Sequence, residues 1–344
     1  MGGFGVPPVE DAGYKAPVQA MFELRPLSTG EILDRTFTLF RQRFWLYVGL
    51  SSVAAAVTTL GTFAQISLGI TGRAPAAGKP NAAALMHLGL VTIGASLVVL
   101  TVHLLAYSIT QAATVSAVEA NYLGRETSIG AAFRTVGGKW YRYILVALWQ
   151  GWSMAWPMLI VILPASILAG VLSMRGGGGP LVIVGLMLLF LLPAFVVGFI
   201  FYLRNSLGIV ACVSERLTVR QSMKRSKLLV ADYKTRAFLL YLLLFVLSFA
   251  VGVVQYFFNI FLMKSDGAVR VGVEIVTLLV AFLSGALVQP VGAIAFVLFY
   301  IDQRVRKEGF DVEMLLEKVT GVPPPPRALD SPFSGDSPFS SPGL

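Results

Sequence analysis

The sequence is poor in cysteine, histidine and charged residues, and each shortage excludes a class of protein. A single cysteine, Cys212, cannot form an intramolecular disulfide, and two histidines, His87 and His103, provide little material for a transition-metal site. We therefore expect no metal and no other cofactor. Charged residues make up only 13% of the 344 residues, whereas soluble domains carry about 25%. This difference excludes a soluble enzyme.

Long apolar blocks make up most of the chain, whereas a soluble protein mixes polar and apolar residues along its sequence. Hydrophobic residues make up 56% of the chain, and six blocks each exceed the ~20 residues that a helix needs to cross a bilayer. The blocks are residues 44–70, 85–118, 143–174, 180–214, 236–263 and 270–301. Continuous apolar runs form spanning helices and not barrel strands, which alternate in polarity. The predicted fold class is all-α, a polytopic membrane protein with six transmembrane helices arranged as three hairpins.

Basic residues lie mostly on one side of these blocks. The short loops after the first, third and fifth blocks hold five Lys and Arg, the opposite side holds 21, and Arg204 lies inside the fourth block. Positively charged segments stay in the cytoplasm, so both termini are predicted to be cytoplasmic. The net charge of +9 is thereby explained by membrane orientation, and we expect no nucleic acid partner.

Three cytoplasmic segments share a pattern that indicates an internal repeat. They begin at Ser28, Thr127 and Thr218, and each places an arginine seven residues later, at Arg35, Arg134 and Arg225. Glu31 and Gln221 stand three residues after Ser28 and Thr218, which is the spacing of a capping box at a helix start. Apolar residues at helical spacing predict a short interfacial amphipathic helix before each odd-numbered span.

The repeat divides the chain into a central domain and two tails. Residues 23–319 are predicted to form the six-helix transmembrane domain, with repeats at 28–118, 127–214 and 218–302 and an amphipathic C-terminal helix. Residues 1–22 and the Pro/Ser-rich residues 320–344 have the composition of disordered cytoplasmic tails.

Two stretches carry a family resemblance. LRPLSTGEILDRTFTLFRQRFW (Leu24 to Trp45) and LFYIDQRVRKEGFDVEMLL (Leu298 to Leu316) resemble the glycerophosphoryl diester phosphodiesterase membrane domain family. The resemblance covers about residues 24–318 and implies an all-helical unit of the bacterial inner (plasma) membrane. The family name does not imply the activity, which would need a soluble barrel with paired histidines and metal-binding carboxylates. Because nothing in this chain matches such a barrel, we expect a protein that is not an enzyme.

The leading functional hypothesis is a membrane scaffold or accessory protein. Arg220, Lys224 and Lys227 recur at i, i+4 and i+7, so they share one face of the third short helix. Together with Arg35, Arg134 and Arg225, these residues form a candidate face that binds anionic membrane lipids, a partner protein or a second copy of this chain.

The alternative hypothesis is a transporter of a small molecule or lipid. Its candidate intramembrane polar residues are Arg204, Asn205, Gln255, Asn259 and Gln289. Arg204 could also snorkel to the interface, and the amides could simply bond neighbouring helices. A water-accessible polar cavity lined by Arg204, Gln255 or Gln289 would favour transport, and a dry interior packed with Leu and Ala would favour the scaffold.

Overall fold

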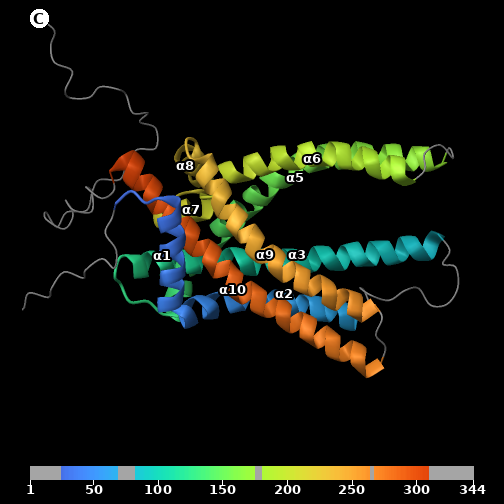
Figure 1. Ribbon diagram of the computed structural model, residues 1–344, viewed down its shortest axis with the longest axis horizontal. Coiled ribbons are helices and arrows are strands. Elements are labelled where there is room, and N and C mark those ends of the chain that lie inside the picture. The colour runs from blue at the N-terminus through green and yellow to red at the C-terminus, as the bar shows by residue number, and fades with distance from the viewer. Residues whose placement is uncertain (1–24, 69–81, 175–179, 264–266, 310–344) are drawn as a thin grey trace, which may run out of the picture.

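The computed structural model describes residues 25–68, 82–174, 180–263 and 267–309, and within these ranges all regular secondary structure is helical (Figure 1). The helices are α1 Thr29–Gln42, α2 Phe44–Ser67, α3 Ala82–Tyr122, α4 Ile129–Gly137, α5 Trp140–Met174, α6 Pro180–Arg204, α7 Gly208–Ser214, α8 Val219–Val230, α9 Lys234–Met263 and α10 Gly267–Glu308. The all-α class is confirmed. The predicted tails and most of the predicted C-terminal amphipathic helix lie outside the described residues.

Six of the helical segments are long and apolar enough to cross a membrane, as predicted. They correspond to α2, α3, α5, α6 with α7, α9 and α10. Large apolar side chains such as Leu163, Leu192 and Phe249 are exposed along them. In water such exposure would be costly, whereas against lipid tails it is the ordinary state of a spanning helix.

The three short helices start where polar side chains satisfy the first backbone amides. Ser28 caps α1 through the expected capping box with Glu31, and Thr218 and Gln221 make the corresponding box at α8. The start of α4 differs from the prediction by one residue, because Ser128 and not Thr127 accepts the hydrogen bond from the Ala131 N–H. Each short helix ends at a break before the next long helix.

Contacts between helices follow one pattern around the bundle. The paired neighbours in sequence, α2 with α3, α5 with α6 and α9 with α10, contact each other. In addition α4 packs against α3, α8 packs against α7, and α1 packs against α10. Figure 1 shows α1 running transverse to α2 and α3, across one end of the bundle.

The hydrophobic core lies at one end of the bundle, which we call the core end. It is formed by α1, α4, α7 and α8 with the adjoining parts of α3 and α10, and it buries Ala113, Ala117, Ala211, Ala295 and Leu298. Small side chains allow such close helix approach. Toward the opposite end, which we call the splayed end, the α5–α6 pair diverges from α3 and from α9 and α10 (Figure 1).

The fourth predicted block is not one continuous helix. It breaks between Arg204 at the end of α6 and Gly208 at the start of α7. The hydroxyl of Ser226 donates to the Arg204 carbonyl at 2.9 Å and accepts from the Leu207 N–H at 3.1 Å. Irregular backbone at membrane depth is tolerated only where protein groups satisfy it, and α8 provides such a group here.

A buried carboxylate ties the start of the described chain to the last span. Asp302 on α10 is almost fully buried, and it accepts hydrogen bonds from the Leu27 N–H at 2.7 Å, Arg236 at 3.2 Å and Arg306 at 2.9 Å. Arg306 also donates to the Leu27 carbonyl at 2.6 Å. These bonds connect the segment before α1 with α9 and α10.

Candidate functional site

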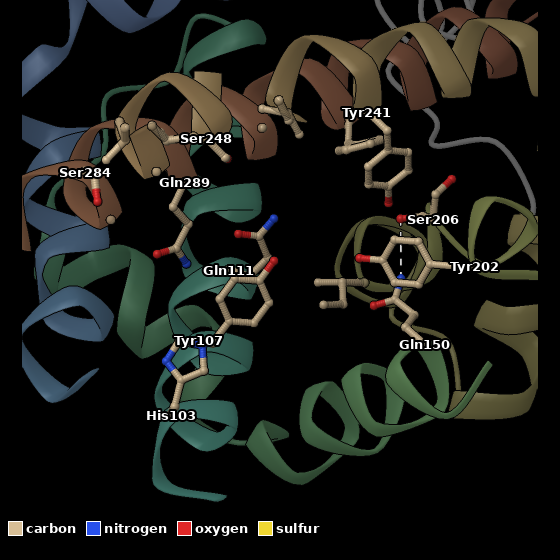
Figure 2. A pocket seen from close by; sticks show the side chains of 18 of the residues that line it. His103, Tyr107, Gln111, Gln150, Tyr202, Ser206, Tyr241, Ser248, Ser284 and Gln289 are labelled. Carbon is tan, nitrogen blue, oxygen red and sulfur yellow. Dashed lines mark hydrogen bonds between the residues drawn. The ribbon is translucent and has the colours of Figure 1, made fainter. Parts of the chain in front are cut away.

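A polar cavity lies between the central parts of the spans, next to the core end (Figure 2). Its volume of about 410 Å³ is within the range of small-molecule sites, about 300–1,000 Å³. The described lining residues come from α3, α5, α6, α7, α9 and α10 and from the break between α6 and α7. Its polar members are His103, Tyr107, Gln111, Gln150, Tyr202, Ser206, Tyr241, Ser248, Gln255, Ser284 and Gln289.

The cavity is polar but carries no formal charge. Eleven of its twenty described lining residues have a polar side chain, and none of the twenty is Asp, Glu, Lys or Arg. Polar groups away from water are costly unless they are hydrogen-bonded. A cluster of amides, hydroxyls and phenols inside the apolar spans is therefore the arrangement expected of a ligand site and not of a purely structural core.

One wall of the cavity is built on the break between α6 and α7. Gln150 on α5 donates a hydrogen bond to the Asn205 carbonyl at 2.6 Å and a longer one, 3.4 Å, to the Ser206 carbonyl. The ring of Tyr241 lies 5.3 Å from that of Tyr202, measured between centroids. Figure 2 shows Gln150, Tyr202, Ser206 and Tyr241 grouped on this side. The break thereby places polar groups on the cavity surface.

The other wall consists of α3 and α10. Figure 2 shows the side-chain amides of Gln111 and Gln289 near each other, with Tyr107 beside Gln111. The ring of His103 lies 5.9 Å from the ring of Tyr107, and its Nδ1 atom contacts the hydroxyl of Thr58. Two spans that are far apart in sequence thus place amide groups at one location.

The five predicted intramembrane polar residues lie in different environments in the structure. Gln255 and Gln289 line the cavity. Asn205 is buried in the helix break, where it donates to the Ser153 hydroxyl at 2.6 Å. Arg204 is exposed, with its guanidinium 5.9 Å from the Phe201 ring centre, and Asn259 is also exposed. Neither of these two is among the described lining residues.

The predicted basic face is only partly exposed. Arg220 and Lys224 on α8 are exposed and Lys227 is half-buried. Arg225 points inward, where it bonds Glu215 at 2.9 Å and Glu308 at 2.6 Å. Burial lowers the pKa of the Arg225 guanidinium, but the bonds to Glu308 and Glu215 outweigh burial and raise that pKa above its usual value. Arg225 is therefore part of an internal ion-pair network.

The other two predicted basic residues differ from each other. Arg35 is half-buried on α1, and it donates to the hydroxyl of Tyr122 on α3 at 3.0 Å. Arg134 is exposed on α4. Among the six predicted residues, Arg220, Lys224 and Arg134 are thus the ones that present an exposed side chain.

No protein-family model, curated protein or solved structure matches this chain. The resemblance to the glycerophosphoryl diester phosphodiesterase membrane domain family stays an expectation from the sequence.

Proposed function

We propose that this protein is a transporter that binds a small amphiphilic molecule in the cavity between its spans. The observation that carries this proposal is the cavity of about 410 Å³ with polar walls contributed by α3, α5, α6, α9 and α10. Gln255 and Gln289, two of the three residues that the transport hypothesis places at a cavity, lie on its surface. This favours transport over a scaffold, which would not need a polar space within the bundle.

The depth of the cavity supports a path across the membrane. On α9, Tyr241 lies seven residues after Lys234, the first residue of the helix, and Gln255 lies 21 residues after it. At 1.5 Å per residue these positions are about 10 Å and about 31 Å along the helix. The lining therefore covers much of the ~30 Å thickness of a hydrocarbon core.

We place the core end at the cytoplasmic face of a bacterial inner membrane, with both termini inside. The exposed Arg220, Lys224 and Arg134 are all at the core end, and basic residues favour the cytoplasmic side. The orientation is tested with single cysteines at Gln221 and Ala268, because the native Cys212 is buried. A membrane-impermeant thiol reagent added to whole cells should label Ala268→Cys only. Labelling of Gln221→Cys would show that the core end faces the outside of the cell.

The helix contacts support three repeated units, each a short interfacial helix followed by a hairpin of two spans. The short helix of each unit packs against the second span of the preceding unit, as α4 does on α3 and α8 on α7. The contact of α1 with α10 closes the series into a ring. Repeated units around a site with a broken helix are a known design of transporters.

A cavity-filling substitution tests the proposal. Gly252 on α9 lines the cavity, and a Cβ atom added there would have no atom within 4 Å. Gly252→Phe should fill the space without distorting the fold, and Gly272→Phe on α10 is the matched control because its surroundings are equally open and it is not among the described lining residues. Native mass spectrometry should detect a bound amphiphile in wild type and Gly272→Phe but not in Gly252→Phe. Equal occupancy in all three proteins, or none in wild type, would contradict the proposal.

A second candidate is the scaffold function, in which the α8 face gathers anionic lipid or an acidic partner. The exposure of Arg220 and Lys224 on one side of α8 favours it. The two functions are compatible, because the basic face and the cavity use different residues.

A further inference from the structure

Three buried polar atoms, each on a residue that lines the cavity, have no hydrogen-bond partner within the described part of the chain. They are Gln111 Oε1 on α3, Ser206 Oγ at the helix break and Gln289 Nε2 on α10. Buried polar groups in proteins are nearly always hydrogen-bonded, so each exception needs an explanation. Because all three residues line one cavity, a molecule bound there would explain them together.

The chemistry of these atoms defines what such a molecule must offer. An amide oxygen accepts hydrogen bonds only, an amide nitrogen donates only, and a serine hydroxyl does both. A carboxylate or a fully ionised phosphate could satisfy Gln289 but not Gln111, and an ammonium group could satisfy Gln111 but not Gln289. A hydroxyl group both donates and accepts, so hydroxyls can satisfy all three sites.

His103 adds a further polar ring to the cavity. The Thr58 hydroxyl lies 2.9 Å from the Ala54 carbonyl and also contacts His103 Nδ1. If its one hydrogen goes to Ala54, its oxygen accepts from the Nδ1–H of His103. A neutral imidazole whose Nδ1 carries the proton has Nε2 as an acceptor. In that tautomer the ring prefers a donor such as a hydroxyl over an anionic oxygen.

The charge balance disfavours an ionic headgroup. With no Asp, Glu, Lys or Arg among the described lining residues, a phosphate or an ammonium group would lack a counter-charge at the cavity surface. An unpaired charge away from water is far more costly than a neutral polar group. The same cavity also has apolar lining from Leu244, Val251, Val288 and Phe296, which suits a hydrocarbon chain.

We infer that the cavity binds an uncharged, hydroxyl-bearing amphiphile, of which a monoacylglycerol is the simplest example. The inference rests on the proposed function, since it names the class of molecule that the transporter takes. The hydroxyls would bond Gln111, Ser206 and Gln289, and the acyl chain would lie against α9 and α10.

Two probes that differ only by a phosphate test this inference. Binding of 1-oleoylglycerol and of 1-oleoylglycerol 3-phosphate to the full chain is measured in phosphatidylcholine nanodiscs, because maltoside detergents carry hydroxyl headgroups of their own. Wild type should bind the neutral probe at least tenfold more tightly than its phosphate ester. Equal or tighter binding of the phosphate ester would overturn the inference.

Leucine substitutions locate the binding and have a matched control. Gln111→Leu and Gln289→Leu should each weaken binding of 1-oleoylglycerol at least tenfold. Gln65→Leu on α2 also removes a buried amide whose Nε2 has no partner, but Gln65 is not among the described lining residues, so its variant should bind as wild type does. All three variants should melt at or above the wild-type temperature, because a buried amide atom without a hydrogen-bond partner does not stabilise the fold.

The results separate this inference from the proposed function. If wild type binds neither probe while Gly252→Phe still loses its bound amphiphile, the ligand class is wrong and the transporter proposal stands. If Gly252→Phe retains the amphiphile, the transporter proposal itself is wrong. If both leucine variants bind 1-oleoylglycerol as wild type does, the cavity amides do not recognise the headgroup and the inference fails.

Discussion

Gln150 on α5 donates a 2.6 Å hydrogen bond to the carbonyl oxygen of Asn205, at the point where the fourth span stops being helical. Ser226 on α8 bonds the backbone on both sides of the same break. Ser206, between the two bonded segments, lines the cavity. Side chains from α5 and α8 thus hold the backbone that forms one cavity wall.

Removing either of these side chains should destabilise the protein. Ser226→Ala leaves the Arg204 carbonyl without its side-chain donor and the Leu207 N–H without its side-chain acceptor, at a cost of about 1–3 kcal/mol. Gln150→Ala should cost less, because the Asn205 carbonyl still accepts a hydrogen bond from the Gly208 N–H at 3.0 Å. The measurement is the thermal unfolding of the purified protein in nanodiscs. Ser166→Ala is the control, because Ser166 is exposed and bonds only its own helix at Leu163. Unchanged melting of both test variants would show that the break is not held in this way.

The buried carboxylate of Asp302 should be more important for stability than any exposed acid. Asp302→Ala leaves Arg236 and Arg306 without this partner and the Leu27 N–H without an acceptor. Breaking a buried ion pair costs about 3–5 kcal/mol, and the lower figure applies here because both arginines are about one quarter exposed. Asp34→Ala on the exposed side of α1 should change stability little. Similar unfolding of the two variants would contradict the role of Asp302.

The start of α1 should lose stability in acid, whereas the start of α8 should not. The Ser28 backbone N–H, followed by the Ser28 hydroxyl and Arg25, lowers the pKa of Glu31 from 4.5 to about 2. A depressed folded-state pKa means that Glu31 stabilises α1 above pH 4.5 and that this contribution is lost as the pH falls toward 2. The α8 box uses Gln221, which does not titrate in this range.

Comparison of two variants isolates the effect of pH on α1. The difference in melting temperature between wild type and Glu31→Gln should vary between pH 5 and pH 2.5, because only the carboxyl titrates. The corresponding difference for Gln221→Ala should stay constant over the same range. A Glu31→Gln difference that does not depend on pH would show that the carboxylate makes no special contribution to the cap.

The exposed face of α8 should attract anionic membranes. Changing Arg220, Lys224 and Lys227 together to Gln should remove about 2–3 kcal/mol of surface attraction at low salt, at ~1 kcal/mol per residue, and less at high salt because of screening. The helix should persist, since Gln is nearly as good a helix former. Co-purified anionic lipid is measured at two salt concentrations. Arg270→Gln at the splayed end is the control. If wild type, the triple variant and the control co-purify with equal amounts of anionic lipid, the α8 basic residues do not bind lipid and only orient the chain in the membrane.

The sequence predicts the spans well because their signal is local. Twenty or more consecutive apolar residues determine a spanning helix, and Ser28 with Glu31 determines a helix start, without any partner elsewhere in the chain. The helix break at Asn205 and Ser206 was not predicted. Both side chains compete for backbone hydrogen bonds in the way that favours a break, but the partners that stabilise it, Gln150 and Ser226, come from other helices.

The cavity could be predicted only in part because it depends on packing between distant spans. Gln111, Gln150 and Tyr241 are single polar residues within apolar blocks, and only the folded arrangement brings them to one space. The interpretation of Arg225 also depended on a partner that is distant in the sequence. The helical spacing of Arg225 placed it on a basic surface, whereas its partner Glu308 lies 83 residues further along the chain.

The most direct test of a ligand site within the bundle is photolabelling with a diazirine-bearing 1-acylglycerol. The full chain in phosphatidylcholine nanodiscs is irradiated with the probe, and the modified residues are identified by mass spectrometry. We expect adducts on cavity residues of α9 and α10, such as Val251 and Val288, that disappear when excess 1-oleoylglycerol is added or when Gly252 is changed to Phe. Adducts confined to exposed residues such as Leu192 and Phe249, unaffected by either treatment, would contradict it.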